Sequence, residues 1–422
     1  MKILWILNMV LPSVAKELNF KTSSSGGWLV DYANKLSVDE NFKLATMTYA
    51  NVPSYIEKDV NGIKNYIFPG GGKRLLFTSK KTLKDLKKVI DDFKPDLIHV
   101  HGTEYSMAYS LVQLHLNIPI LVTIQGILTR ISKEYYAGLS RKELWKTTTI
   151  KEWIKGKTVF TAKWLFLRNA KRERKVLKNV KYVTGRTSWD RSLMLSINPN
   201  LKYYRHNYNL REEFYNQPLW QVDNAEPYTI YCGAATYPLK GLHIILKALA
   251  IVKDQYPQIK LKIPGHSISN GKVVANNGYT KFILKMIKEL NLENNVEFVG
   301  RLTSLKVVDT LQSSRMVIVS SAMEGASATI CEAMMIGTPC ICTYRGGMTS
   351  LLHDGESGFY YDFEEYPVLA DRIIKLLNND DLCTKFSKNA HEDACIRHNR
   401  EKNYTKLTEI YEDILKKEGD KL

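Results

Sequence analysis

The chain has 422 residues and a formal net charge of +17. This length exceeds what one hydrophobic core supports and predicts two domains of ordinary size, while 44% hydrophobic and 24% charged residues are typical of a soluble globular protein. No stretch approaches the roughly 20 apolar residues that a membrane-spanning helix requires. The short apolar run at Ile3–Leu7 indicates a buried strand rather than a secretory signal.

Short β-rich runs alternate with helical patterns along the chain. In the first half we expect buried parallel strands at Ile3–Leu7, Lys43–Met47, Leu97–Val100, Ile120–Ile124 and Tyr182–Thr184, with helices around Leu29–Leu36 and Lys81–Phe93. In the second half we expect strands at Thr229–Cys232, Lys260–Ile263, Val296–Val299, Met316–Val319 and Cys340–Cys342, with helices at Leu242–Asp254, Tyr279–Leu290, Leu305–Gln312 and Thr329–Met335. Two such series predict an α/β protein with two doubly wound, Rossmann-like domains facing each other across a cleft.

The junction between the domains is predicted in the polar stretch Tyr208–Glu226. We therefore assign residues 1–207 to the first domain and 208–403 to the second. The final helix, residues 404–422, has no place in the second series, and we expect it to cross back to the first domain.

Two glutamates follow the apolar strand that contains Met316–Val319. Glu324 precedes a Gly-Ala-Ser turn, and Glu332 lies within the apolar helical pattern that comes next. A strand that leads through a glycine turn to a helix N-terminus is a common anion-binding arrangement in α/β proteins. We expect Glu324 at the carboxyl end of the strand and Glu332 two turns along the helix, as separate carboxylates for hydroxyls of a sugar and a ribose. The spacing is equally compatible with a structural alternative, in which Glu324 is an ordinary first-turn glutamate and Glu332 is a solvated helix position.

Cysteine and basic residues are unevenly distributed. All six cysteines fall in the second half without a Cys-x-x-Cys pair, so we interpret them as reduced thiols in a cytoplasmic protein. Between Lys151 and Lys181, eleven Lys or Arg face two acids and are interleaved with aromatic residues. This segment, 151–181, fits an anionic membrane surface. Amphipathic helices with solvated lysines fit equally well, whereas no motif supports a nucleic-acid partner.

A series of short motifs along nearly the whole chain resembles retaining glycosyltransferases of the GT-B fold, in particular family 4, also called glycosyl transferases group 1. The motifs occur in family order at Gly26–Gly27, Pro95–His101, Thr123–Gly126, Gly185–Asp190, Gly233–Gly241, Pro264–Gly265, Val296–Gly300, Glu324–Glu332, Gly346–Gly347 and Asp354–Phe359. The resemblance implies that the first domain binds the acceptor and the second the nucleotide sugar.

The resemblance also assigns roles to individual residues. It implies that Lys240 binds the donor diphosphate, that Glu324 holds the donor sugar and that Glu332 holds the ribose. The matching loops add Gly26, Gly27, Arg186, Arg301, Ala326 and Ser327 to the donor site. Arg186 is equally compatible with a helix N-terminal or interdomain salt bridge.

Two positions depart from the family pattern. Ala234 stands where an arginine is usual, so one of two phosphate-binding cations is missing. Gln125 stands where histidine is common; it can contact a sugar at the catalytic centre with Glu324 and Lys240, but it cannot accept a proton near pH 7. The chain has no Asp-x-Asp motif, so we expect neither a metal nor any other cofactor.

The expected function is transfer of a hexose-type sugar from a UDP- or GDP-linked donor to a glycan or lipid-linked saccharide, in cell-surface polysaccharide synthesis. The expected location is the cytoplasm, peripherally on the inner face of the membrane. Two alternatives are a sugar-nucleotide epimerase of the same fold and a catalytically silent nucleotide-sugar-binding protein.

Overall fold

The computed structural model describes residues 1–20, 27–70, 77–233, 235–269, 272–275 and 277–420. They form two compact units. Unit 1 contains Met1–Thr129, Leu167–Leu210 and His398–Leu422, and unit 2 contains Arg130–Phe166 and Arg211–Arg397. Within the described residues, no helix is long and apolar enough to cross a membrane.

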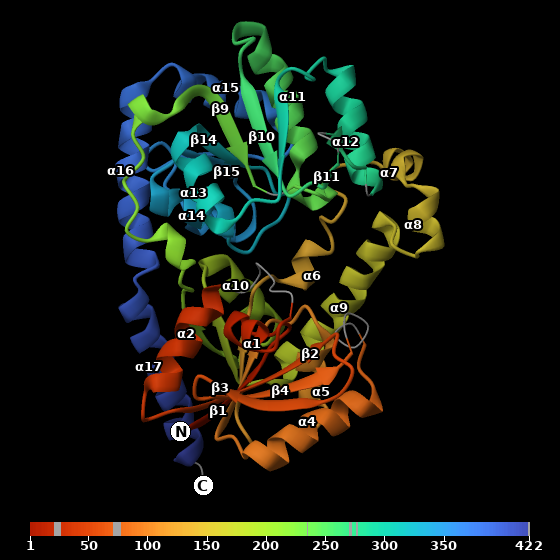
Figure 1. The fold of residues 1–422 in the computed structure, drawn as a ribbon, viewed down its shortest axis with the longest axis vertical. Coiled ribbons are helices and arrows are strands. Elements are labelled where there is room, and N and C mark those ends of the chain that lie inside the picture. Colours follow the sequence, from red (N-terminus) through yellow and green to blue (C-terminus); the bar gives the residue numbers. More distant parts are fainter. Residues whose placement is uncertain (21–26, 71–76, 234, 270–271, 276, 421–422) are drawn as a thin grey trace. The chain divides into compact units, whose positions relative to one another are not determined.

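Unit 1 is built on an eight-stranded sheet in the order β3-β4-β2-β1-β5-β6-β7-β8 (Figure 1). Its neighbouring strands are parallel except for the antiparallel pair β3 and β4. The strands are β1 (Lys2–Ile6), β2 (Lys43–Ala50), β3 (Ile56–Val60), β4 (Ile63–Pro69), β5 (Leu97–His101), β6 (Ile120–Thr123), β7 (Tyr182–Gly185) and β8 (Lys202–Arg205). The helices are α1 (Pro12–Glu17), α2 (Gly27–Val38), α4 (Lys80–Phe93), α5 (Ser106–Val112), α10 (Ser188–Ile197) and α17 (Arg400–Gly419).

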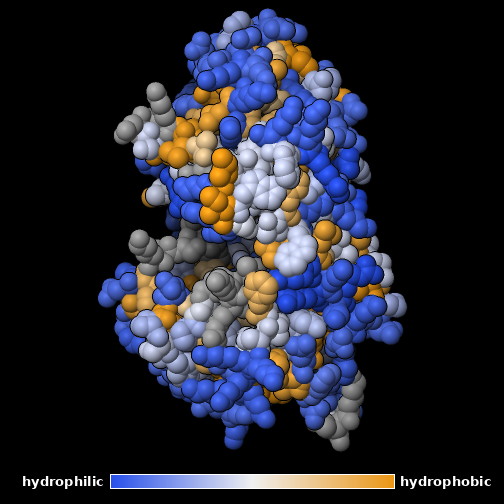
Figure 2. All heavy atoms as spheres, turned by 90° about the vertical axis from the view of Figure 1, so that its right-hand side faces the viewer, coloured by the Kyte–Doolittle hydropathy of each residue, from blue (hydrophilic) through white to orange (hydrophobic). Residues whose placement is uncertain are grey.

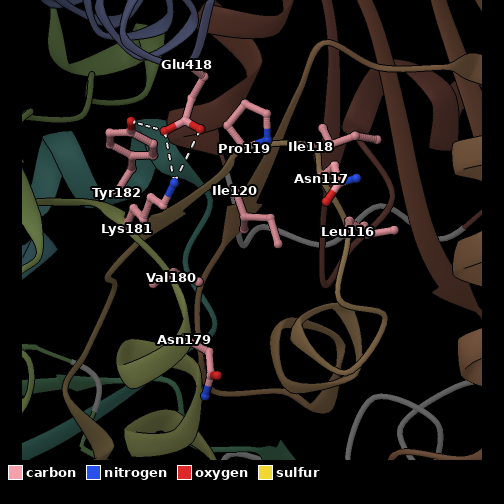
Figure 3. Close-up of a pocket in the computed structure, with 10 residues that line it drawn as sticks. All are labelled: Leu116, Asn117, Ile118, Pro119, Ile120, Asn179, Val180, Lys181, Tyr182 and Glu418. Carbon is pink, nitrogen blue, oxygen red and sulfur yellow. Dashed lines mark hydrogen bonds and ion pairs between the residues drawn. The ribbon is translucent and has the colours of Figure 1, made fainter. Parts of the chain in front are cut away.

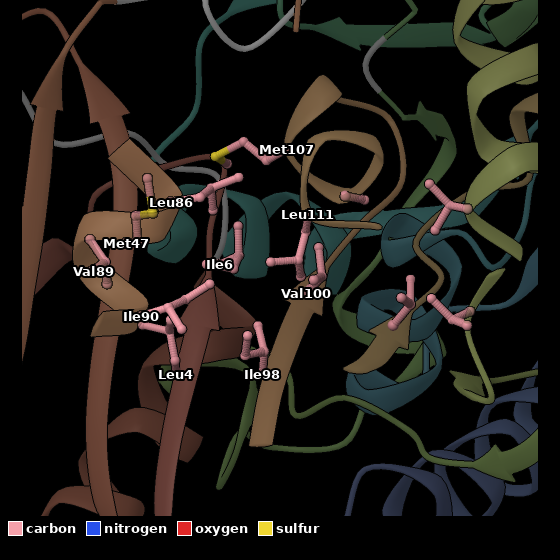
Figure 4. Packing of buried hydrophobic residues seen from close by; sticks show 14 of the residues in the cluster. Leu4, Ile6, Met47, Leu86, Val89, Ile90, Ile98, Val100, Met107 and Leu111 are labelled. Atoms are coloured by element: carbon pink, nitrogen blue, oxygen red, sulfur yellow. The ribbon is translucent and has the colours of Figure 1, made fainter. Parts of the chain in front are cut away.

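Alternation along β1 builds a separate apolar layer on each face of this sheet. Leu4 and Ile6 point into a cluster that also contains residues of α4 and α5 (Figure 4). Ile3 and Trp5 point into the opposite cluster, which contains residues of α2 and α17. Because successive side chains of a strand alternate between faces, one central strand anchors both layers.

Helix α17 completes the second of these layers. Its Tyr411 is fully buried, accepts a hydrogen bond from Trp5 Nε1 at 3.0 Å and lies 2.7 Å from His99 Nδ1. At the start of the helix, Arg400 Nε donates to Asp31 of α2 at 3.1 Å. The last helix of the chain therefore belongs to unit 1, the part of the chain to which we expected it to return.

Unit 2 contains a six-stranded parallel sheet in the order β13-β10-β9-β14-β15-β16. Its strands are β9 (Glu226–Cys232), β10 (Lys260–Pro264), β13 (Val296–Gly300), β14 (Ser314–Val319), β15 (Cys340–Thr343) and β16 (Phe359–Tyr361), with a separate hairpin of β11 (Ile268–Ser269) and β12 (Lys272–Val273). Its α-helices are α6 (Leu128–Ile131, which begins in unit 1), α7 (Arg141–Thr147), α8 (Ile150–Ile154), α11 (Leu242–Gln255), α12 (Gly278–Glu289), α13 (Ser304–Ser313), α14 (Ala328–Ile336), α15 (Tyr366–Leu377) and α16 (Asp380–Arg397).

The predicted boundary at 207/208 is wrong for residues 130–166, which belong to unit 2 rather than to the first domain. Glu152 of α8 accepts the backbone N–H of Gly278 at 3.0 Å, and Ala137 O accepts His243 Nε2 at 2.9 Å. These contacts join the segment to α12 and α11. The unit boundary therefore lies inside the long helix α9 (Val159–Asn179).

Every strand and helix expected from the sequence is present, with ends shifted by a few residues. The expectation missed β3, β4, β8, β16 and the short hairpin β11–β12. All six cysteines are free, and only Cys395 is exposed.

Candidate active site

The predicted catalytic pair meets at the carboxyl ends of β9 and β14 in unit 2. Lys240 follows β9 in a short 3-10 turn, and Glu324 follows β14. Lys240 Nζ lies 2.6 Å from Glu324 Oε2, and Ser321 Oγ donates to the same oxygen at 2.9 Å. Burial opposes the charge on Lys240, but the attraction of Glu324 outweighs it and raises the pKa of this lysine above its ordinary value. Lys240 therefore carries its charge at this edge of the sheet.

Two glycines allow the backbone to pack closely around this pair. Gly241 has φ +68°, and a Cβ there would lie 1.8 Å from Ser320 O. Gly346 has φ +65°, and a Cβ there would lie 2.3 Å from Glu324 O. Because only glycine fits both the left-handed backbone and the close approach, these residues fix Lys240 and Glu324 in place.

A small hollow beside the pair is lined by the ends of β9 and β14 and by the start of α14. Its lining residues include Gly233, Lys240, Ser321, Ser327 and Thr329. Ser327 is the N-cap of α14, where its Oγ accepts the N–H of Ile330 at 3.4 Å. A lysine beside a helix N-terminus, at the carboxyl end of a parallel sheet, is suited to a phosphate group. Ala326, which immediately precedes Ser327, is half-buried in the same turn.

Glu332 lies about one turn into α14 rather than two, because the helix begins at Ala328. It is not a solvated helix position: its side chain is 13% exposed and pairs with Arg211. Burial raises the Glu332 pKa above its usual value, and Arg211 limits that rise. The sequence prediction missed Arg211, which lies 121 positions away and has no recognisable motif.

The other predicted donor residues are dispersed. Arg301 is exposed just after β13, and Gly27 begins α2 in unit 1. Gly26 lies outside the described residues, as does Ala234. The structure therefore brings Lys240 and Glu324 together near Ser327, the N-cap of α14, and Glu332 lies further along this helix. The donor-binding roles of Gly27 and Arg301 stay predictions.

Gln125 and Arg186 lie together in unit 1, beyond the carboxyl ends of β6 and β7. Arg186 Nη2 donates to the backbone oxygen of Gln125 at 2.7 Å, and the guanidinium lies over the ring of Tyr208 at 4.7 Å. Among the residues that the structure describes, the Gln125 side-chain amide makes only one long contact, from Nε2 to His101 O at 3.5 Å. Arg186 is thus held by groups of its own unit, and its predicted contact with a donor phosphate stays a prediction.

A carboxyl group that sequence reasoning missed lies beside Gln125. Glu104 Oε1 accepts the N–H of Gly126 at 3.1 Å, whereas its buried Oε2 has no partner among the described residues. Burial, together with the nearby Glu173, raises the Glu104 pKa to about 7. The sequence signal was its position three residues after β5, at the carboxyl edge of a parallel strand.

Another hollow of unit 1 lies at the opposite, amino-terminal edge of β6 and β7. It has a volume of about 340 Å³ and is lined by Leu116, Asn117, Ile118, Pro119, Ile120, Asn179, Val180, Lys181, Tyr182 and Glu418 (Figure 3). Its carboxylate is already engaged, since Tyr182 Oη donates to Glu418 at 2.6 Å and Lys181 lies at 3.3 Å. Ligands of open parallel sheets bind at the other edge, so this hollow is not the candidate site.

The part of the chain around the Lys240–Glu324 pair matches a known family. Residues 217–393 match the family model described as "Glycosyl transferases group 1". This segment is a group 1 glycosyltransferase domain. It contains the Lys240–Glu324 pair, Ser327 and Glu332, but it begins after Arg211.

Comparisons with individual proteins agree with this assignment. A D-inositol 3-phosphate glycosyltransferase of Corynebacterium urealyticum is 27% identical over 176 residues, 42% of this chain and 41% of the relative. The matches cover about a third to two fifths of the length of the curated relatives.

Solved structures match over the whole chain. A sucrose-phosphate synthase from Thermosynechococcus elongatus has a TM-score of 0.74 and 16% identity, with 98% of each chain covered. The Anabaena protein HepE, solved in complex with UDP-glucose, has a TM-score of 0.67 and 17% identity over 98% of this chain and 100% of its own. The predicted fold class is thereby confirmed: the chain has the GT-B fold, with two Rossmann-like α/β domains.

Proposed function

We propose that the protein is a cytoplasmic, retaining glycosyltransferase that transfers a hexose-type sugar from a UDP- or GDP-linked donor to a glycan or lipid-linked saccharide. The observation that carries this proposal is the Lys240–Glu324 pair beside the N-terminus of α14, inside a group 1 glycosyltransferase domain. The solved complex of HepE with UDP-glucose supports a nucleotide sugar as the donor class. The polysaccharide context of the acceptor follows from the family resemblance.

In this proposal Lys240 and the N-terminus of α14 stabilise the donor diphosphate as it leaves. The chain has no Asp-x-Asp sequence to bind a bridging metal, so these groups supply the compensating positive charge. Glu324 accepts hydrogen bonds from hydroxyls of the donor sugar and holds Lys240 charged and close by. Glu332, fixed by Arg211, accepts hydrogen bonds from the ribose.

The reaction exchanges one bond at the anomeric carbon for another. The bond from this carbon to the diphosphate oxygen breaks, and the acceptor oxygen forms a new bond on the same face. The acceptor proton passes to the departing diphosphate oxygen. No side chain of the protein needs to take that proton, so the protein contributes orientation and charge stabilisation.

A nucleotide-release assay tests the proposal. The purified protein is incubated with a panel of UDP- and GDP-sugars, with and without saccharide acceptors, and products are identified by mass spectrometry and by NMR of the anomeric centre. Free nucleotide together with an α-linked product from an α-linked donor supports the proposal. An altered sugar still attached to its diphosphate would establish an epimerase instead. Thermal stabilisation without turnover across the panel would establish a binding protein.

A further inference from the structure

Residues 141–158, which comprise α7, α8 and the short segments that join them to each other and to α9, expose an unusual set of apolar side chains. Ile150 and Ile154 are 80% and 81% exposed, and Trp145 and Trp153 are 62% and 45% exposed. Ile150 and Ile154 lie one turn apart on the same face of α8. The rings of Trp145 and Trp153 are 5.0 Å apart. We call these four residues the apolar tip.

The apolar tip belongs to a firmly held piece of structure. Both helices begin with complete capping boxes, Ser140 with Glu143 and Thr149 with Glu152. Glu152 also accepts the N–H of Gly278, and a Cβ on Gly278 would lie 2.7 Å from Thr147 O. These contacts hold α7 and α8 against α12, and the four apolar side chains are exposed in this arrangement.

The charges around the tip are almost all positive. Six basic side chains of residues 141–158 are exposed: Arg141, Lys142, Lys146, Lys151, Lys155 and Lys157. Of the two acids, Glu152 is buried. Glu143 is exposed, but Ser140 binds its carboxylate, and these hydrogen bonds lower the Glu143 pKa, so it stays ionised. A net positive rim thus surrounds an apolar centre.

Figure 2 shows the corresponding face, on which orange and near-white spheres interrupt the blue of the polar surface. Isolated exposed apolar residues are ordinary on protein surfaces, but four on one short segment are not. Tryptophan with isoleucine, ringed by lysines, is the composition that binds at the interface of an anionic bilayer: the apolar side chains enter the headgroup region while the ammonium groups contact lipid phosphates.

We propose that the apolar tip and its basic rim dock the protein on an anionic phospholipid membrane. This surface differs from the segment 151–181 that the sequence indicated, because it includes Trp145, which precedes that segment. The basic residues of α9 beyond Phe166 belong to unit 1 and are not needed for the interaction. The inference goes beyond the proposed glycosyl transfer and is independent of it, because it rests on residues outside the Lys240–Glu324 site.

The test is co-sedimentation of the full chain with vesicles of phosphatidylcholine alone or mixed with phosphatidylglycerol. We expect wild-type protein to sediment with the anionic vesicles and to be released by salt. A variant with Ile150→Ser and Ile154→Ser should bind at least tenfold more weakly. A variant with Lys146→Glu, Lys151→Glu and Lys155→Glu should lose binding by a similar or larger factor. All five positions are exposed, so these variants are expected to fold.

Matched controls come from other exposed positions of unit 2. The apolar control combines Leu305→Ser with Ile396→Ser and removes the same kind of exposed apolar surface. The charge control combines Lys288→Glu, Lys306→Glu and Lys388→Glu and reverses the same number of charges. Both controls should bind vesicles like wild type, and every variant should keep its affinity for nucleotide sugars. Equal losses of vesicle binding in the test variants and the controls would overturn the proposal. Failure of the wild-type protein to sediment with anionic vesicles at low salt would also overturn it. If the wild-type protein does not bind vesicles but forms a dimer at high concentration, and if the Ile150 and Ile154 changes abolish this dimer, then the apolar tip binds a second copy of the chain instead of a membrane.

Discussion

Arg211 contacts one oxygen of Glu332 through two of its nitrogens: Nη2 lies 2.7 Å and Nε 3.2 Å from Oε1. The third nitrogen, Nη1, donates to Ser304 Oγ at 2.8 Å. Among the described residues, no hydrogen bond to Oε2 of Glu332 is present, so this oxygen is available to a ligand. Arg211 thereby positions the carboxylate that we assign to the ribose.

Arg211→Ala should lower the free energy of unfolding by about 3 kcal/mol, because it leaves the largely buried Glu332 carboxylate without its counter-charge. Arg211→Ala combined with Glu332→Ala should lose less than the sum of the single changes. Urea unfolding of the wild type, both single variants and the double variant measures this coupling. Strictly additive losses would show that the ion pair has no energetic role. Lys285→Ala, which breaks an exposed ion pair with Glu289, is the control and should change stability by less than about 1 kcal/mol.

Glu332→Ala should raise the donor KM by the equivalent of about 1.5–3 kcal/mol, the range for a hydrogen bond to a charged group, while kcat changes little. The physical reason is that a ribose contact is present equally in the ground state and the transition state. Steady-state kinetics with saturating acceptor measures both constants. A fall in kcat without a change in KM would move Glu332 from donor binding to the chemical step.

Glu324→Ala should abolish transfer, because it removes the carboxylate that orients the donor sugar and also leaves Lys240 without its counter-ion. Ser321→Ala is the matched control. It removes only one hydrogen bond to the same Oε2 and should reduce kcat/KM modestly, by about 1 kcal/mol. Nucleotide release with and without acceptor measures the effect. Similar, small losses in both variants would show that Glu324 is structural.

Lys240→Ala should weaken donor binding severely, because this lysine is the principal side-chain cation beside the α14 N-terminus. Lys247→Ala removes an exposed lysine from α11 and should leave donor affinity unchanged. Calorimetric titration with UDP and with uridine separates the contribution of the diphosphate from that of the nucleoside. The affinity for UDP should fall in Lys240→Ala, whereas the affinity for uridine should not change. Unchanged UDP affinity in Lys240→Ala would exclude the phosphate role.

Local sequence patterns identified the central strands and the Lys240–Glu324 site because both depend on short segments. A buried parallel strand is a continuous apolar run, and the site residues follow such strands through glycine turns. The edge strand β3 was missed because its pattern, Ile-Glu-Lys-Asp-Val, is half exposed and polar in the middle. The position of residues 130–166 was missed because it depends on contacts such as Glu152 with Gly278, 126 positions away.

Dependence on contacts between residues far apart in the sequence also explains why Arg211 and Glu104 were not predicted. Arg211 has no motif, and its role depends entirely on the folded position of Glu332. Glu104 follows a recognised strand, but its environment depends on Gly126 and on Glu173 of α9. Its altered proton affinity could therefore be recognised only in the folded chain.

Glu104 makes the stability of unit 1 depend on pH in a defined direction. Burial of its carboxyl, reinforced by Glu173, raises its pKa to about 7, above the ordinary 4.5. The folded protein therefore binds more protons than the unfolded chain between these values, and the free energy of unfolding falls as pH rises through this window. Glu104→Gln keeps the shape but cannot ionise. Relative to wild type, its stability should thus increase by up to about 3 kcal/mol between pH 5 and pH 8. Urea unfolding of both proteins at each pH measures the difference, in which titrating groups that do not interact with Glu104 cancel. A difference that stays constant across this range would show that Glu104 ionises at its ordinary pKa and that its buried oxygen is hydrated.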